Sequence, residues 1–263
     1  MRRSSGRMLL SALVAAVAVY LVAPMLIVVP MSFSASDELR FPPVGFSTRW
    51  YEHFFTDPLW TSATTTSLQV ALATVVVATV LGTLAALGLT RGRYPARTIV
   101  NGLILSPMVV PVVIVAIGMY FVFVDWRLAG TLPGLVAAHS VLAIPFVIVN
   151  VSVSLRTIDR NLELAAQNLG AGPWQTFRRI TLPLILPGVA AGALFAFITS
   201  WDEVVVAIFL SSPLVRTLPV VMWSQVRSVI DPTIAAVATM VMLVTTVSLL
   251  VILFVRQRSG ART

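Results

Sequence analysis

Six long runs of apolar residues constrain the fold of this chain more than any other feature of its sequence. They lie at roughly 8–31, 67–90, 98–124, 132–155, 187–210 and 233–255. Each run reaches the roughly 20 residues that a helix needs to cross the hydrocarbon core of a bilayer. Only 11% of the 263 residues are charged and 58% are hydrophobic, whereas soluble domains carry about 25% charged residues. We therefore predict an all-α integral membrane protein whose six transmembrane helices form one domain, 1–263.

Prolines interrupt several of these runs. Pro107 and Pro111 lie in the third run and Pro145 in the fourth. Membrane helices tolerate proline where neighbouring groups satisfy the freed backbone carbonyls. These positions are interpreted either as ordinary packing irregularities or as hinges.

The formal net charge of +8 indicates orientation in the membrane. With a cytoplasmic N-terminus, the inner segments hold 13 of the 18 arginines and two acids, so they carry +11 and the remainder −3. Cytoplasmic segments are enriched in Arg and Lys, so we expect both termini inside, an outer loop at 32–66 and a cytoplasmic loop at 156–186. The first run exceeds a signal-peptide core, and we expect it to stay as an uncleaved span. Basic residues placed between apolar runs do not form a nucleic-acid-binding face.

Few residue types that support catalysis or metal binding are present. The chain has no cysteine and two histidines, His53 and His139, which lie far apart in the sequence. We therefore expect no helix-borne metal site or catalytic triad, and no cofactor bound by this chain.

The loop at 156–186 has the sequence of a helical elbow. A short helix is predicted over 162–169 and is followed by Gly170, because glycine favours the left-handed conformation after a helix end. A second helix is predicted over 173–179, since Pro173 suits a first helical turn. Such an exposed elbow fits a groove on another protein, although a plain amphipathic linker would have the same pattern.

The same loop resembles the signature of permease subunits of binding-protein-dependent ABC importers, which reads Glu-Ala-Ala, three residues, Gly, nine residues, Ile-x-Leu-Pro. The matching residues are Ala165, Ala166, Gly170, Ile180, Leu182 and Pro183. Leu164 stands at the position of the glutamate, and Glu163 lies one residue earlier. The resemblance covers nearly the whole chain and is greatest for the spermidine/putrescine-type branch, through the segment 197–209, Leu218-Pro219, Asp231-Pro232 and Ala235-Ala236.

The resemblance implies the type I ABC importer permease fold in a bacterial cytoplasmic (inner) membrane. It implies half of a pore for a small, cationic solute such as a polyamine, with a second permease subunit (a paralogue or another copy) as the other half. Two ATP-binding cassette subunits, which hold ATP and Mg, would dock on the coupling loop, and an external solute-binding protein would deliver the solute. The coupling residues would be Glu163, Ala165, Ala166, Gly170, Pro173, Ile180, Leu182 and Pro183. Without lysine the chain has no phosphate-binding Gly-x-x-x-x-Gly-Lys loop, so we expect no enzyme activity of its own.

Two alternatives remain for the transported solute and the transport class. Related branches carry iron, phosphonates, thiamine or other small solutes. A secondary transporter would work without an ATPase partner, but it predicts an internal inverted repeat, and the sequence has no evident symmetry of this kind.

Paired acids in the fifth run form the candidate translocation path. Asp202 is about 21 Å along a predicted helix that rises 1.5 Å per residue, and ionisable residues at such depth usually face the bundle interior or a wet cavity. With Thr199 and Trp201, Asp202 and Glu203 would line the path and attract a cation. Alternatively, the acids form a structural pair with Arg127, Arg216 or Arg227.

Overall fold

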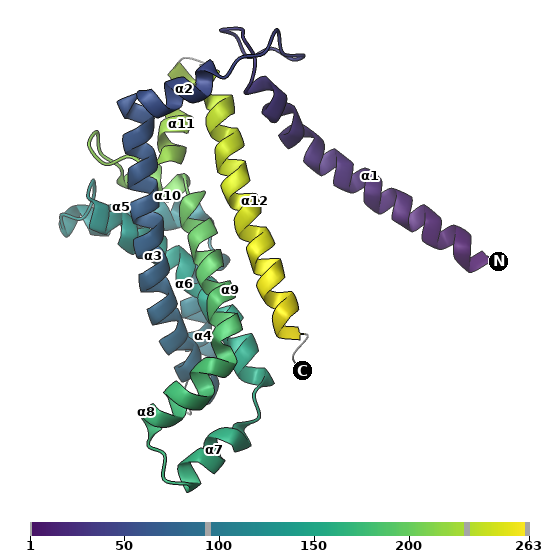
Figure 1. Cartoon of the computed structure of the whole chain (residues 1–263). Helices are drawn as coiled ribbons and strands as arrows, with labels where there is room; N and C mark the ends of the chain where they lie inside the picture. The colour runs from purple at the N-terminus through teal and green to yellow at the C-terminus, as the bar shows by residue number, and fades with distance from the viewer. Residues whose placement is uncertain (1, 93–95, 229–231, 261–263) are drawn as a thin grey trace. The chain divides into compact units, whose positions relative to one another are not determined.

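The computed structural model describes residues 2–92, 96–228 and 232–260, and over these ranges the regular structure is entirely helical. Arg93 and Arg262, two of the 13 inner arginines, and Asp231 lie outside the described residues. Contacts divide the chain into two compact units, 1–61 with 222–243 and 62–221 with 244–263, and each is described by itself. The helices are α1 (Arg2–Met31), α2 (Arg49–Thr56), α3 (Pro58–Arg91), α4 (Arg97–Leu105), α5 (Val112–Asp125), α6 (Leu132–Thr157), α7 (Arg160–Asn168), α8 (Pro173–Thr176), α9 (Leu182–Trp201), α10 (Val205–Leu210), α11 (Leu218–Ser228) and α12 (Thr233–Gly260) (Figure 1).

Five of the helical stretches are long and apolar enough to cross a membrane. They belong to α1, α3, α6, the stretch Pro173–Trp201 and α12, and a sixth span exists if the bent pair of α4 and α5 is counted as one. The prediction of an all-α membrane protein is therefore confirmed. α3 begins at Pro58, well before the predicted start of the second run at residue 67.

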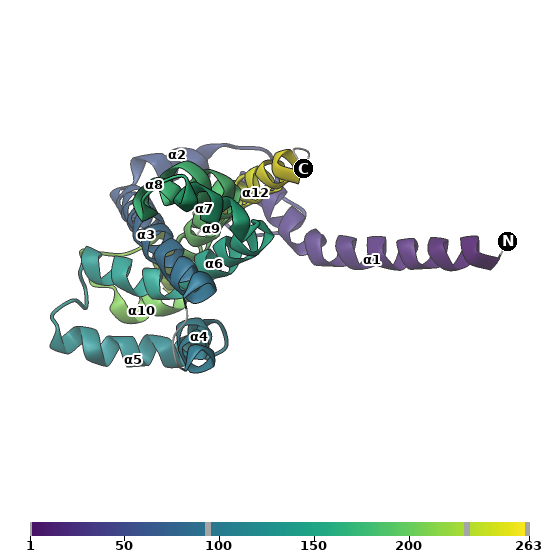
Figure 2. The same ribbon diagram turned by 90° about the horizontal axis from the view of Figure 1, so that it is seen from below.

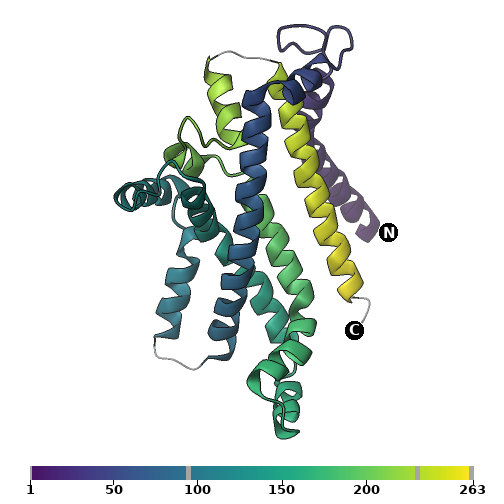
Figure 3. The same ribbon diagram turned by 60° about the vertical axis from the view of Figure 1, so that its left-hand side comes forward.

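The third predicted span, 98–124, is not one straight helix. It is divided into α4, a 3-10 turn (Ser106–Met108) and α5, with a bend of 99° between the two parts (Figure 3). Pro111 lacks an N–H and disfavours the helical conformation of the residue before it. Pro111 has φ −52° and ψ 126°, outside the helical region, and occupies the position directly before α5. The prolines thus produce a sharp change of direction.

The fifth predicted span, 187–210, both begins and ends later than the helix in the structure. The helix is continuous from Pro173 to Trp201 and includes a π-helical turn at Phe177–Thr181. In this turn the Leu182 N–H donates to the Phe177 carbonyl, five residues earlier. We attribute the wider turn to Pro183, which follows directly and has no N–H to continue the regular ladder. The second arm of the predicted elbow is therefore the start of the membrane helix, and the chain turns again after Trp201.

Close approach of helices defines the core of the unit 62–221, where α6 packs most extensively against α9 (Figure 2). Val147 of α6 is flanked by two glycines: a Cβ at Gly82 of α3 would lie 2.7 Å from the Val147 Cβ, and a Cβ at Gly192 of α9 would lie 3.0 Å from the Val147 Cα. At Gly188 of α9, a Cβ would lie 2.9 Å from the carbonyl oxygen of Asn150. Small residues of this kind permit the backbone proximity that stabilises membrane helix pairs.

A second apolar cluster in the same unit joins α5, α6 and α10. It includes Phe123, Leu135 and Leu210. The Gly130 N–H donates to the Leu210 carbonyl at 2.9 Å, and the Ser212 hydroxyl donates to the Gly130 carbonyl at 2.9 Å. These bonds connect the segment after α5 with the segment after α10.

The unit 1–61 with 222–243 contains residues 32–61 of the predicted outer loop; its last residues, 62–66, belong to α3 in the other unit. Part of this loop forms α2. The Trp50 indole N–H donates to the Ser34 carbonyl at 2.9 Å, Ser32 Oγ lies 2.7 Å from Tyr51 Oη, and the Phe33 and Phe46 rings stack at 5.3 Å. The predicted outer segment is thus a folded structure held by its aromatic residues.

Candidate coupling elbow and translocation path

The elbow (residues 160–183) folds as its sequence predicts at the turn. Asp159 caps α7 by accepting the Asn161 N–H at 2.9 Å. After α7, Gly170 has φ +90°, and the Ala171 N–H donates to the Ala166 carbonyl at 3.0 Å. This is the left-handed helix ending that glycine favours. Because a Cβ at Gly170 would meet no atom within 4 Å, backbone conformation and not space accounts for glycine here.

The predicted coupling residues lie on both arms of the elbow. Ala165 is exposed and Ala166 half-buried on α7, Pro173 begins α8, Ile180 is half-buried in the π turn, and Leu182 and Pro183 begin α9. A groove of about 310 Å³ lies between the arms and is lined by Ala166, Leu169, Gly170, Ala171, Gln175, Thr176, Arg179 and Ile180. At the tip of the elbow, Leu169 is 89% exposed and Trp174 is 70% exposed. The elbow therefore presents large apolar side chains.

Glu163 attaches the elbow to the membrane helices. Its carboxylate accepts a hydrogen bond from Thr181 Oγ1 at 2.9 Å and lies 3.4 Å from Arg91 Nη2 at the end of α3. Arg91 also donates to the Leu155 carbonyl near the end of α6 at 3.4 Å. Sequence reasoning placed Glu163 in the coupling loop but missed Arg91, which lies 72 residues away and counted only as an inner charge.

The prediction that Thr199, Asp202 and Glu203 line one path assumes a helix that continues past residue 203, and this assumption is wrong. α9 ends at Trp201, Asp202 is its exposed C-terminal cap and Glu203 is buried. Trp201 is also buried, and its ring stacks on Phe197 at 5.7 Å. The two acids consequently occupy different environments.

Glu203 holds the start of α10. Its two carboxylate oxygens accept the Val206 and Ala207 N–H groups at 2.8 and 2.9 Å. No ion pair of either acid with Arg127, Arg216 or Arg227 occurs among the described residues, contrary to the structural alternative. Hydrogen bonds between a carboxylate and the first N–H groups of a helix replace the expected arginine partner.

A buried polar cluster of His139, Ser200 and Glu203 was not predicted. His139 Nδ1 lies 2.9 Å from Ser200 Oγ, and His139 Nε2 lies 3.7 Å from Glu203 Oε2. Sequence spacing offered no signal, because His139 is 61 residues from Ser200. In the other unit, His53 Nε2 lies 3.7 Å from the carboxylate of Asp57, an acidic residue four positions later in the sequence.

Comparison with known proteins relates this architecture to characterised transporters. Residues 78–260 match the family described as binding-protein-dependent transport system inner membrane component. The chain is 37% identical to the putrescine transport system permease protein PotI of Escherichia coli strain K12 over 230 residues, 85% of this chain and 82% of the relative. It is 31% identical to the spermidine/putrescine transport system permease protein PotC of the same strain over 242 residues, 92% of this chain and 91% of the relative.

Solved structures share the fold. One chain of a bacterial ABC transporter involved in the import of the acidic polysaccharide alginate matches with a TM-score of 0.71 at 18% identity, over 97% of this chain and 96% of that one. A chain of the alginate transporter in complex with an alginate pentasaccharide-bound periplasmic protein also gives 0.71, at 19% identity. The resemblance stated from the sequence is therefore confirmed. The chain belongs to the family of binding-protein-dependent transport system inner membrane components and is a multi-pass permease subunit of an ABC importer with the type I fold.

Proposed function

We propose that this permease subunit forms half of the translocation pore of an ATP-driven importer for a small polyamine such as putrescine or spermidine. The similarity to PotI and PotC over most of the chain is the observation that carries the proposal. A second permease subunit would complete the pore, and an external solute-binding protein would deliver the polyamine.

The elbow is the proposed docking site for an ATP-binding cassette subunit, with one such subunit on each half of the pore. None of the nine residues of α7 is buried, while Leu169 and Trp174 project at the tip of the elbow. Exposed apolar and aromatic side chains beside a groove are typical of residues that anchor a partner. ATP and Mg would be held by that partner.

Asp202 is the proposed cation-attracting acid of the path. Its side chain is exposed at the end of α9, whereas the carboxylate of Glu203 is occupied by two backbone N–H groups. Thr199 and Trp201 precede it on the same helix end. In this proposal Glu203 stabilises α10 and Asp202 contacts the passing solute.

Uptake assays test the proposed solute and transport class together. The chain would be reconstituted with its candidate permease, ATPase and binding-protein partners, and uptake of radiolabelled putrescine and spermidine would be compared with that of iron, a phosphonate and thiamine. We expect ATP-dependent uptake of a polyamine. Uptake of another solute would refute the polyamine proposal, and uptake without the ATPase subunit would favour a secondary transporter.

Asp202→Asn and Glu203→Gln then separate the two acids. We expect Asp202→Asn to raise the KM for the polyamine about tenfold at unchanged thermal stability, as the loss of about 1.4 kcal/mol of cation attraction would do. Glu203→Gln should lower the unfolding temperature and leave the KM of the folded protein unchanged. The opposite pattern would assign the path to Glu203.

The proposed orientation is measurable because the chain has no cysteine. Single variants Leu169→Cys in the elbow and Phe46→Cys in the outer segment both place the thiol at exposed positions. A membrane-impermeant maleimide applied to intact cells should label the Phe46 variant only. Labelling of the Leu169 variant under these conditions would reverse the proposed topology.

A further inference from the structure

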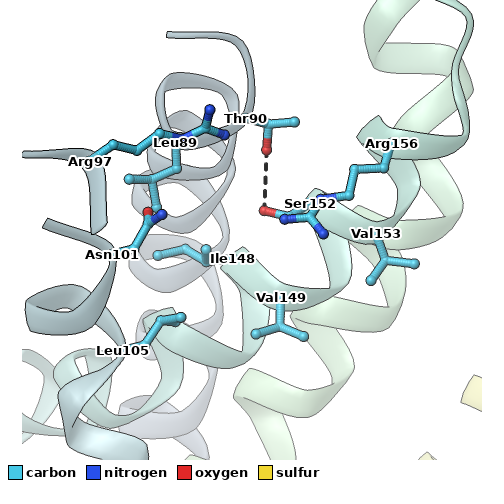
Figure 4. Close-up of a pocket in the computed structure, with 10 residues that line it drawn as sticks. All are labelled: Leu89, Thr90, Arg97, Asn101, Leu105, Ile148, Val149, Ser152, Val153 and Arg156. Atoms are coloured by element: carbon cyan, nitrogen blue, oxygen red, sulfur yellow. Dashed lines mark hydrogen bonds between the residues drawn. The ribbon is translucent and has the colours of Figure 1, made fainter. Parts of the chain in front are cut away.

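A basic pocket lies where α3, α4 and α6 meet beside the elbow, and the proposed function gives it no role. Its volume is about 210 Å³. The lining residues are Leu89, Thr90, Arg97, Asn101, Leu105, Ile148, Val149, Ser152, Val153 and Arg156 (Figure 4). All of them belong to the unit 62–221.

Two arginines converge on the polar part of this pocket. Arg97 on the first turn of α4 and Arg156 near the end of α6 extend from opposite sides toward Thr90 and Ser152, whose hydroxyl groups are 3.4 Å apart (Figure 4). The described lining residues include no acid. Among the described residues neither arginine has an ion-pair partner, unlike Arg91, which is paired with Glu163. Two unneutralised guanidinium groups over one cavity favour an anion.

Further hydrogen-bond donors face the same space. Asn101 lies one turn after Arg97 on α4, and its side chain is half-buried without a hydrogen bond to any other described residue. Arginine forks, an amide and hydroxyl groups together make a set of donors that suits the several oxygens of a phosphate group.

The remaining walls are apolar and lie deeper along the helices. Leu105 is two turns into α4 from Arg97, and Val149 is two turns, about 10 Å, into α6 from Arg156. Both Val149 and Val153 are exposed along this side of α6. A charged rim above an apolar wall complements a lipid, whose phosphate lies at the membrane surface and whose acyl chain extends inward. A free phosphate would leave the apolar wall without a partner.

We propose that this pocket binds the phosphate headgroup of an anionic phospholipid, with Arg97 and Arg156 on the phosphate and the Val149–Val153 side against the acyl chain. Basic pockets between helices at the cytoplasmic surface are suited to such headgroups. The assignment to the cytoplasmic leaflet rests on the proposed orientation, while the binding itself does not depend on it.

Lipid titration of the full-length chain tests the proposal. The purified protein in detergent is titrated with phosphatidylglycerol or with phosphatidylcholine of the same acyl chains, and bound lipid is counted by native mass spectrometry. We expect tighter binding of phosphatidylglycerol. Arg97→Gln and Arg156→Gln should each weaken it about fivefold and the double variant about 25-fold, as loss of one surface cation contact each implies.

Matched controls make each outcome decisive. Arg160→Gln with Arg178→Gln removes two exposed arginines from the elbow, away from the pocket, and should retain wild-type binding. An equal loss of phosphatidylglycerol binding in this control would show that binding depends on net charge alone, and it would overturn the proposal. Displacement of the lipid by an equal concentration of inorganic phosphate would assign the pocket to free phosphate. The single variants give an independent measurement if the double variant does not fold, and the assay needs neither solute nor ATPase, so a failed uptake assay leaves it unaffected.

Discussion

The pair of helices α6 and α9 and the elbow belong to the same unit and are built on opposite principles. In the helix pair, Gly188 and Gly192 bring two backbones together, and no space remains for even one more carbon atom. In the elbow, α7 has no buried side chain, and ion pairing of Glu163 with Arg91 and a hydrogen bond from Thr181 hold it in place. The first arrangement resists deformation, because packed interiors tolerate little change in volume. The second is kept in position by a few polar contacts and leaves its surface free for a partner.

The comparison is tested most strongly by a charge on the free surface of the elbow. Ala165→Glu should reduce ATP-dependent uptake about a hundredfold, because a docking ATPase would have to bury an unpaired carboxylate at its interface. The unfolding temperature should stay unchanged, since Ala165 is exposed. Ala35→Glu adds the same charge at an exposed position outside the elbow and serves as the control, with uptake near the wild-type value. Normal uptake by the Ala165 variant would remove the elbow from the docking role.

A methyl group added between α6 and α9 should instead lower the stability of the protein. Gly188→Ala places a Cβ 2.9 Å from the backbone oxygen of Asn150, so the helices must separate, at a cost of about 2 kcal/mol in unfolding free energy. Gly118→Ala on α5 meets no atom within 4 Å and should be neutral or stabilising. Denaturant unfolding followed by circular dichroism measures both. Equal stability of the two variants would mean that the α6–α9 contact is not the rigid part of the unit.

The ion pair of Arg91 with Glu163, which connects the elbow to α3, should have a smaller effect on stability. A double-mutant cycle of Arg91→Gln and Glu163→Gln should yield a coupling free energy of about 1 kcal/mol for this half-buried pair. The pair Arg40 and Glu38, at 2.9 Å but with side chains 68% and 69% exposed, is the matched control. There we expect a coupling near zero. Coupling that is no larger at Arg91 would show that the elbow is held by other contacts.

An effect of similar size is expected at Gly170, where only the backbone conformation is changed. Gly170→Ala forces a left-handed conformation on alanine at a cost of about 1 kcal/mol. Asparagine should be tolerated better at this position. Gly172→Ala, in the same turn with φ −67° and open space, should cost nothing. Unfolding of the three variants, measured in parallel, separates conformational strain from loss of contacts.

Local signals in the sequence predicted part of this arrangement. The start of α6 agrees with prediction because Thr131 and Pro133 form a helix start, in which Thr131 Oγ1 accepts the Gly134 N–H at 3.1 Å. The turn at Gly170 agrees because glycine provides the left-handed conformation at that position. The groove between the arms and the exposed tip follow from the two helices that this glycine joins.

The wrong predictions of two spans and the unpredicted side-chain contacts share a cause, because both depend on the arrangement of the helices in space. Hydropathy measures transfer into lipid and carries no information about direction, so the runs at 98–124 and 187–210 read as single spans although α4 and α5 meet at 99° and α9 ends at Trp201. Pairings such as Glu203 with His139 join residues that are far apart in sequence. They depend on how helices pack, which residue spacing on one helix does not encode.

The helical stretch from Pro173 to Trp201 connects the elbow to Asp202 without a loop, and the π-helical turn at Phe177–Thr181 is the one irregular turn in it. Beyond that turn, α9 has 20 residues and extends about 30 Å at 1.5 Å per residue. A tilt of about 10° imposed on α9 at the elbow would displace the Asp202 end by about 5 Å, close to the pitch of one helical turn. A helix of this length would let work done on one side of the membrane move the acid proposed to face the solute on the other.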